Sequence, residues 1–130
     1  MDKICLDTDF LVDALRGKKE AASFLLANRD KAYFATTFIT LFELYRGAFN
    51  SSRSESELEA VRKISERFEL LNLSLNSVKL AGELMATLTR RGEAIEIRDL
   101  LIGTIAAVNG FAIKTNNVKH FNRIPNLQMI

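Results

Sequence analysis

The sequence predicts an α/β domain of three layers (α/β/α), with a mostly parallel central sheet of about four to five strands. Short apolar runs of strand length alternate along the chain with longer segments whose apolar residues recur at helical spacing. The chain has 130 residues, which is the usual size of one domain. No repeat, low-complexity tract or linker divides it, so we expect a single domain over residues 1–130.

The first part of the chain predicts two strands and three helices. Residues 4–6 are apolar and form a short buried strand, and a helix follows from about residues 7–10. Helical spacing of apolar side chains predicts the next helix at 18–28. The β-rich sequence AYFATT predicts a strand at 32–37. Residues 38–49 are apolar nearly all round, which predicts a buried helix.

The second part continues the alternation after a polar loop at residues 50–57. Two Ser-x-x-Glu spacings in that loop predict a side-chain cap for the helix that follows. Periodicity then predicts a helix, a strand, two helices, a strand and a possible last strand, at 58–68, 69–75, 78–91, 99–109, 111–115 and 126–130.

Composition narrows the class of protein. With 48% hydrophobic and 26% charged residues, the chain has the composition of an ordinary globular domain. No apolar stretch approaches the ~20 residues that a membrane helix needs, and no signal-peptide pattern opens the sequence. We therefore expect a cytoplasmic protein with no membrane partner. The one cysteine, Cys5, has no internal disulfide partner and is expected to be a small buried hydrophobe.

The distribution of charge is more informative than its sum. The net charge of +2 does not by itself predict nucleic-acid binding. After Asp99, however, the chain contains no acid and carries Lys114, Lys119 and Arg123. These residues are either scattered solvated charges or a modest basic rim that contacts phosphates.

Three acids stand out by their surroundings. Asp7 follows the first strand directly, Glu43 lies inside an apolar helix, and Asp99 opens another apolar helix. Asp7 is also a suitable helix cap, and a first-turn Asp99 suits the helix dipole. Glu43 has a structural explanation as the partner of Arg46, three residues on. Chance alone does not readily place all three acids at strand ends and in a buried helix.

Clustered oxygen ligands of this kind suit Mg2+ or Mn2+, and phosphoryl transfer is the chemistry most often built on them. Other chemistries lack their motifs. One histidine and one cysteine are too few for a standard zinc site. The sequence has neither a Walker-type phosphate loop nor a Gly-x-Ser-x-Gly elbow.

Two families that also begin with a strand and clustered acids fit less well. A phosphatase of the haloacid-dehalogenase type would use Asp7 and Asp9, but it needs a further acid pair, and no acid follows Asp99. A receiver domain needs a phosphoacceptor aspartate near the middle of the chain, where residues 50–59 contain none. Asp9 is better interpreted as a residue of the helix start.

Four motifs occur in order over essentially the whole chain: LDTDFLVDAL, ITLFELYRG, IRDLLIGTIAAVNG and KTNNVKHFNRIPNL. Together they resemble PIN-domain ribonucleases, and most closely the VapC-type toxins of toxin–antitoxin pairs. The resemblance implies Mg2+- or Mn2+-dependent hydrolysis of RNA by a metal-activated water. It also implies a small antitoxin protein that blocks the site, and a homodimer.

By this resemblance, Asp7, Glu43 and Asp99 match the metal-binding acids of the family. Asn117 lies in the segment where many members place a fourth acid, and it offers a carbonyl oxygen without charge. His120 is the competing candidate for that position. The remaining candidates are substrate-binding residues: Thr8, Arg46, Lys114, Thr115, Lys119 and Arg123.

Two alternatives stay open at this point. Without the fourth acid, the domain is also compatible with a PIN-like module that binds a partner and cuts nothing. A PIN nuclease that processes RNA without being a toxin fits the same residues.

Overall fold

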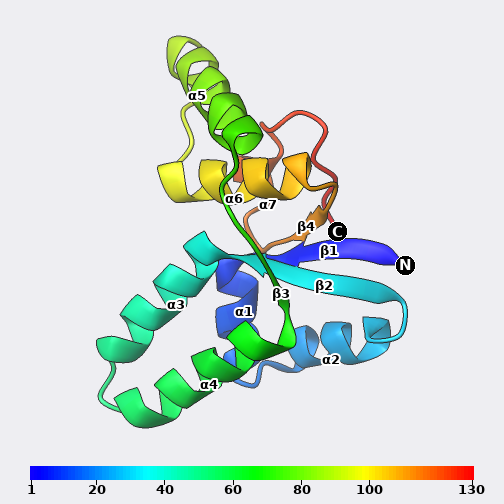
Figure 1. Cartoon of the computed structure of the whole chain (residues 1–130), viewed down its shortest axis with the longest axis vertical. Coiled ribbons are helices and arrows are strands. Elements are labelled where there is room, and N and C mark those ends of the chain that lie inside the picture. Colours follow the sequence, from blue (N-terminus) through cyan, green and yellow to red (C-terminus); the bar gives the residue numbers. More distant parts are fainter.

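The computed structural model describes residues 1–130 and has a parallel sheet with helices on both faces (Figure 1). The strands are β1 (Asp2–Leu6), β2 (Ala32–Thr37), β3 (Glu69–Leu71) and β4 (Ala112–Lys114). Their spatial order is β3-β2-β1-β4, and all three pairings are parallel. The predicted three-layer architecture is confirmed, with four strands.

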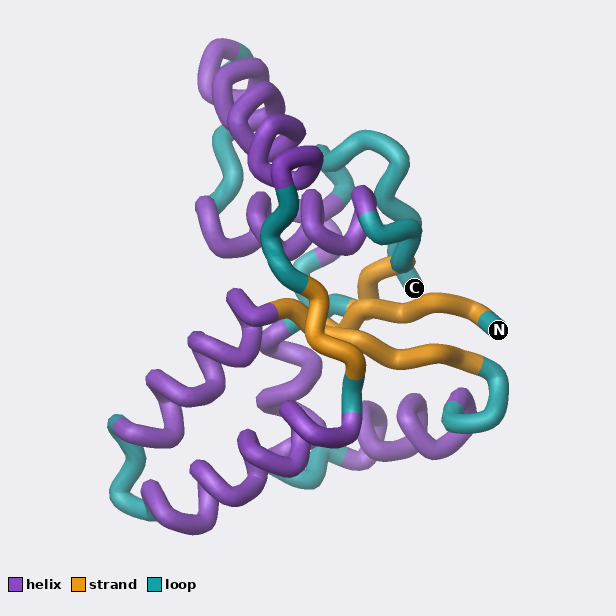
Figure 2. Tube along the Cα trace, viewed as in Figure 1, coloured by secondary structure: helices purple, strands orange, loops and turns teal.

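Six helices connect the strands and a seventh follows the last one: α1 (Thr8–Leu15), α2 (Lys19–Asn28), α3 (Phe38–Phe49), α4 (Ser54–Arg67), α5 (Leu75–Arg90), α6 (Ile97–Val108) and α7 (Val118–Phe121). Helices α1 to α4 cover one face of the sheet and α5 to α7 the other (Figure 2). None of the helices combines the length and the apolar character that a membrane span requires.

Residues 4–6 of strand β1 are buried on both faces of the sheet. Successive side chains of the strand point to opposite faces and so pack in two separate cores. Ile4 and Leu6 belong to the cluster packed with α1 to α4, whereas Cys5 belongs to the cluster packed with α5 to α7. The Cys5 thiol is fully buried, and this burial raises its pKa, with a further rise from the charge of Asp7. The expectation of a buried cysteine is confirmed.

The start of α4 differs from its prediction. The helix begins at Ser54 rather than near residue 58, and its N-cap residue, Arg53, makes no side-chain cap bond. The predicted cap is therefore wrong. Glu55 and Glu57 lie in the first turn, where their charges suit the helix dipole without a cap. A capping box occurs instead at the start of α5.

The other differences lie after the sheet strands. Strand β3 ends at Leu71 rather than residue 75, because the chain turns there into the capping box of α5, formed by Ser74 and Ser77. The possible last strand is reduced to one bridge between Ile113 and Met129. Helix α7 was not predicted, because four residues are too few to show helical periodicity.

Helix α6 packs closely against α7 and the segment that follows it, and Gly103 makes this approach possible. A β-carbon at Gly103 would lie 2.2 Å from Ile124 Cδ1 and 3.1 Å from Phe121 Cδ1. Both of these side chains are buried. The absence of a side chain at Gly103 therefore determines how near α7 comes to α6.

We predict that Gly103→Ala destabilises the protein although alanine favours helices. Overpacking against Ile124 and Phe121 should outweigh the helix-propensity gain and leave a net loss of about 1–2 kcal/mol. Gly82→Ala is the matched control, because Gly82 lies in α5 with nothing within 4 Å of the added carbon. It should gain about 0.5–1 kcal/mol. Urea unfolding measures both, and stabilisation by Gly103→Ala would contradict the packing argument.

Candidate active site

The site begins where β1 and β4 end side by side. The Asp7 amide donates to Lys114 O at 3.0 Å, which extends the strand pairing by one step. The Thr115 hydroxyl then donates to Asp7 Oδ2 at 2.7 Å, and the backbone N–H of Asn117 donates to Thr115 Oγ1 at 2.9 Å. The segments that follow β1 and β4 therefore meet at one site, at the carboxyl ends of two neighbouring parallel strands.

Asp7 is a buried carboxylate, with an exposed fraction of 3%. This burial raises the pKa of Asp7 to about 7; the hydrogen bond from Thr115 opposes the rise and the charge of Asp9 adds to it. Asp7 occupies the N-cap position of α1, but its side chain makes no cap bond. The cap interpretation is therefore wrong, because the carboxylate turns to Thr115. Asp9 lies in the first turn, where its Oδ1 accepts from the Phe10 amide at 2.8 Å.

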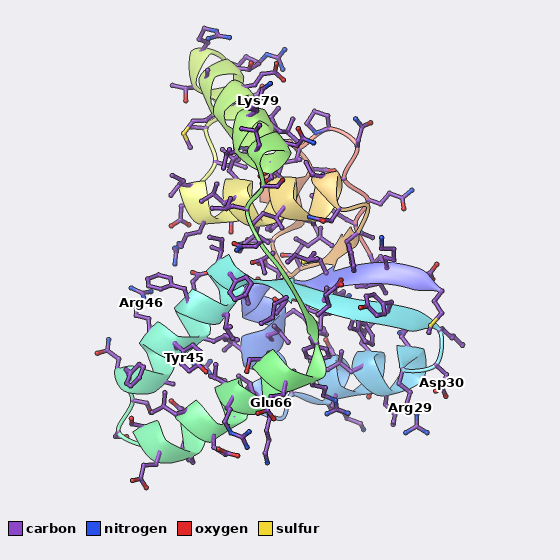
Figure 3. All side chains as sticks on the ribbon, in the orientation of Figure 1. Arg29, Asp30, Tyr45, Arg46, Glu66 and Lys79 are labelled. Carbon is purple, nitrogen blue, oxygen red and sulfur yellow. The ribbon has the colours of Figure 1, made fainter.

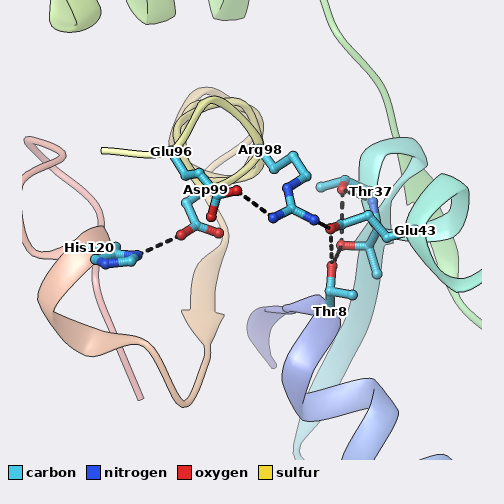
Figure 4. Close-up of polar contacts among 8 residues, drawn as sticks. Thr8, Thr37, Glu43, Glu96, Arg98, Asp99 and His120 are labelled. Atoms are coloured by element: carbon cyan, nitrogen blue, oxygen red, sulfur yellow. Dashed lines mark hydrogen bonds and ion pairs between the residues drawn. The ribbon is translucent and has the colours of Figure 1, made fainter. Parts of the chain in front are cut away.

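Glu43 reaches the site from α3 and is oriented by a hydroxyl of α1. The Thr8 hydroxyl lies 2.7 Å from Glu43 Oε1 and 3.0 Å from Thr40 Oγ1 (Figure 4). Thr37 ends β2 and caps α3, accepting from the Thr40 amide at 3.0 Å. This cap fixes the start of α3 relative to the sheet, and so the place from which Glu43 projects.

The ion-pair partner of Glu43 is Arg98, so the structural alternative that paired Glu43 with Arg46 is wrong. Arg98 Nη1 lies 2.5 Å from Glu43 Oε2, and its Nη2 contacts Glu96 (Figure 4). The Thr8 hydroxyl donates to one oxygen of Glu43, and the other oxygen contacts Arg98, the second residue of α6. Arg46 is exposed and projects outward from α3 (Figure 3).

Asp99 lies in the first turn of α6, as predicted, and its side chain contacts α7. His120 Nδ1 and Asp99 Oδ2 are 2.7 Å apart (Figure 4). Because a carboxylate accepts hydrogen bonds, Nδ1 is the ring nitrogen that donates here. His120 therefore lies beside one of the three acids.

One cleft of about 410 Å³ collects these side chains. Its lining is Asp7, Thr8, Asp9, Val12, Asp13, Arg16, Glu43, Glu96, Arg98, Asp99 and Asn117. Six carboxylates and two arginines give the lining a formal net charge of −4 when Asp7 is ionised. The structure thus brings together five predicted residues: Asp7, Thr8, Glu43, Asp99 and Asn117. Sequence reasoning missed Arg98, because no local spacing links it to α3.

The predicted basic residues do not line this cleft. The Lys114 ammonium lies 4.7 Å from the centre of the Phe24 ring, against α2. Arg123 donates to the carbonyl oxygens of residues 93 and 94 in the loop before α6. Lys119 is exposed. Lys114, Lys119 and Arg123 therefore lie outside the lining of the cleft, and their role in binding RNA stays a prediction.

The oxygen ligands in the cleft are of the type that a hard divalent cation binds, but their side chains do not converge on one ion position. Carboxylate and amide oxygens are the ligands that Mg2+ and Mn2+ prefer. Nowhere, however, do three acidic, histidine or cysteine side chains converge on one possible ion position. Arg98 holds Glu43 and His120 holds Asp99. Binding of a cation by all three acids therefore requires their side chains to lie closer together than they do here.

Residues 4–127 match the family model of the PIN domain. The chain is 30% identical over 129 residues to the tRNA(fMet)-specific endonuclease VapC of Salmonella typhimurium, a match that covers 99% of this chain and 97% of that protein. It is 33% identical over 127 residues to Ribonuclease VapC2 of Rickettsia felis, which covers 94% of this chain and 92% of that protein.

Two solved structures share this fold over nearly their full length. A crystal structure of VapBC2 from Rickettsia felis, bound to a fragment of promoter DNA, aligns with a TM-score of 0.89 and 29% identity. It covers 98% of this chain and 97% of that chain. DNA-bound VapBC from Salmonella typhimurium aligns with a TM-score of 0.86 and 27% identity, covering 100% and 98%.

We predict that the stability of the metal-free protein depends on the protonation of Asp7. Because its pKa rises from 3.8 to about 7 on folding, the folded protein holds this proton more tightly than the unfolded chain. The free energy of unfolding should therefore fall as the pH rises between these two values, by about 1.4 kcal/mol for each unit of pKa.

Asp7→Asn should remove this decline and melt above the wild type at about pH 8 in EDTA, where ionised Asp7 is a net cost. Asp2→Asn removes the same charge from an exposed position and should keep the wild-type profile. Thermal melts of the three proteins across the pH range measure the effect. An Asp7→Asn variant less stable than the wild type at high pH would contradict the assignment.

Proposed function

Since the chain belongs to the PIN domain family, and within it to the VapC ribonucleases, we propose that it hydrolyses RNA phosphodiester bonds with Mg2+ or Mn2+. We further propose that it is the toxin of a VapBC-type pair. One observation carries the metal-dependent function: buried Asp7 lines the same cleft as Glu43 and Asp99, and this lining has a formal net charge of −4 when Asp7 is ionised. Such a cleft repels RNA phosphates unless cations occupy it.

Asp7, Glu43 and Asp99 are the residues that would hold the ion, with Asn117 offering a neutral oxygen. A bound divalent ion activates water and neutralises charge that develops on the phosphate. Thr115 holds Oδ2 of Asp7 by donating to it, and its hydrogen bond favours the ionised carboxylate that binding needs. Thr8 orients Glu43 in the same way. These hydroxyls set the directions of the two acids before a cation arrives.

The binding-only alternative rests on the lack of a fourth acid at Asn117. The charge of the cleft does not depend on that position, because Asp9, Asp13 and Glu96 also line it. Attraction of a cation is therefore supported without a carboxylate at Asn117. The processing alternative uses the same residues and differs from the toxin only in its substrate and partner.

A small antitoxin protein is the proposed partner. The two solved structures described above, with TM-scores of 0.89 and 0.86, are of VapBC from Rickettsia felis and Salmonella typhimurium. A toxin has to be kept inactive until it is needed, and the metal site lies in an open cleft. We therefore expect the partner to block access of RNA to that cleft.

The exposed face of α3 supports the proposal of a homodimer. Phe38, Phe42, Tyr45 and Phe49 recur at helical spacing along it, and Phe42 and Phe49 are 64% and 69% exposed. The three phenylalanines alone leave roughly 250–450 Å² of aromatic surface in water. A contiguous patch of this size matches the largest patch that a monomer usually exposes, and such patches often have a binding function. A second copy of the chain covers it with the same side chains.

We predict that wild-type protein cleaves RNA with Mg2+ or Mn2+ and not in EDTA. Asp7→Asn and Asp99→Asn should each lower the cleavage rate by about 100-fold or more, because each removes a charged ligand of the ion. Asp30→Asn, an exposed acid outside the cleft, is the control and should cleave like the wild type. Gel assays on structured and single-stranded RNA measure the rates.

Cleavage by the wild type in EDTA would refute the metal dependence. Near-normal cleavage by Asp7→Asn or Asp99→Asn at saturating Mg2+ would refute the assigned ligands. Metal-dependent RNA binding without cleavage of either substrate would favour the binding-only module. Circular dichroism of each variant shows that a loss of activity is not a loss of fold.

For the homodimer, we predict that Phe42→Asp and Phe49→Asp shift the protein to a monomer, because each places a charge in the covered apolar patch. Leu26→Asp is the matched control: Leu26 is an exposed apolar residue on α2, away from α3, and should leave the dimer intact. Light scattering after size exclusion measures the mass. A wild-type monomer at high protein concentration would contradict the proposal.

A further inference from the structure

Arg98 is a cation inside the acidic cleft that the proposed function does not use. It lies one residue before Asp99 in the first turn of α6, and it bridges Glu43 of α3 and Glu96 of its own helix start. Arg16 also lines the cleft. Arg98, however, is the arginine that makes an ion pair with one of the three expected metal ligands.

Both carboxylate oxygens of Glu43 are already engaged. Oε1 accepts from the Thr8 hydroxyl, and Oε2 accepts from Arg98. The Glu43 side chain is only 11% exposed, so a carboxylate without the guanidinium would be a largely buried charge. Arg98 thus supplies, in the metal-free protein, the positive charge that Glu43 needs.

A divalent ion on Glu43 would compete directly with this guanidinium. A guanidinium at hydrogen-bond distance from a carboxylate that also binds a dication is repelled by that ion. Thr8 carries no charge and can keep its hydrogen bond. Arg98 is therefore the partner that has to leave, and its side chain is 40% exposed, which leaves it room to move into the cleft.

We propose that Arg98 is a positioning residue that holds Glu43 in the metal-free protein and exchanges this carboxylate for an RNA phosphate when the ion binds. The inference rests on the proposed function. A phosphate is the matching acceptor, because a guanidinium forms two parallel hydrogen bonds to it. The exchange links the two ligands: a phosphate that takes Arg98 frees Glu43 for the ion, and the ion frees Arg98 for the phosphate.

The first test is calorimetric titration of Mn2+ into the RNA-free protein. Arg98→Met should tighten Mn2+ binding by roughly three- to tenfold, because the ion no longer competes with a guanidinium. Arg46→Met is the matched control: it removes the same charge from an exposed position one helical turn after Glu43. It should change the affinity by less than about twofold, since exposed charges are screened.

The second test separates KM from kcat in RNA cleavage at saturating Mn2+. Arg98→Met should raise KM by roughly three- to tenfold with a smaller change in kcat, because it loses a contact to the phosphate. Arg98→Lys keeps the charge without the fork and should lie between the wild type and Arg98→Met in both Mn2+ affinity and KM. If Arg98→Met does not fold, Arg98→Lys alone tests the role of Arg98 in both measurements.

The outcomes distinguish the inference from the function beneath it. Equal or weaker Mn2+ binding by Arg98→Met relative to the wild type would overturn the role of Arg98. So would equal tightening by Arg46→Met, or an unchanged KM in Arg98→Met. Absence of Mn2+ binding to every variant, the wild type included, would instead overturn the metal-dependent function itself.

Discussion

The parallel pairing of β1 with strands on both of its sides is the constraint from which the site follows. Ladder bonds to β2 and β4 leave β1 no freedom to slide, and the Thr36 hydroxyl donates to Leu6 O at the strand end. Asp7 is consequently delivered to a place that is nearly closed to water. A carboxylate there is tolerated because Thr115 donates to it from the end of β4.

The acids of the cleft are each held by a donor from another element. Thr115 serves Asp7, Thr8 and Arg98 serve Glu43, and His120 serves Asp99. These contacts reduce the repulsion among carboxylates that the fold places together. They also explain why the acids line one cleft without converging, since each donor draws its acid toward a different wall.

Sequence patterns predicted the parts of this arrangement that have a local signal. Strand-length apolar runs and helical spacing located nearly every element, and Asp7, Glu43 and Asp99 stood out because each acid adjoins or interrupts an apolar segment. Long-range contacts have no such signal. Arg46 was the one structural partner considered for Glu43, because a three-residue spacing is visible in the sequence. Arg98, 55 residues away, is brought near only by the packing of α6 against α3.

The residues that line the cleft come from elements packed in two different hydrophobic clusters, one on each face of the sheet. Asp7 and Glu43 stand on elements anchored in the cluster of α1 to α4, whereas Asp99 and His120 stand on helices anchored in the other. The distances between these carboxylates therefore depend on how helices α1 to α4 and helices α5 to α7 pack on the two faces of the sheet. Selection on the packing of either half, even at residues far from RNA, is also selection on the geometry of the chemistry.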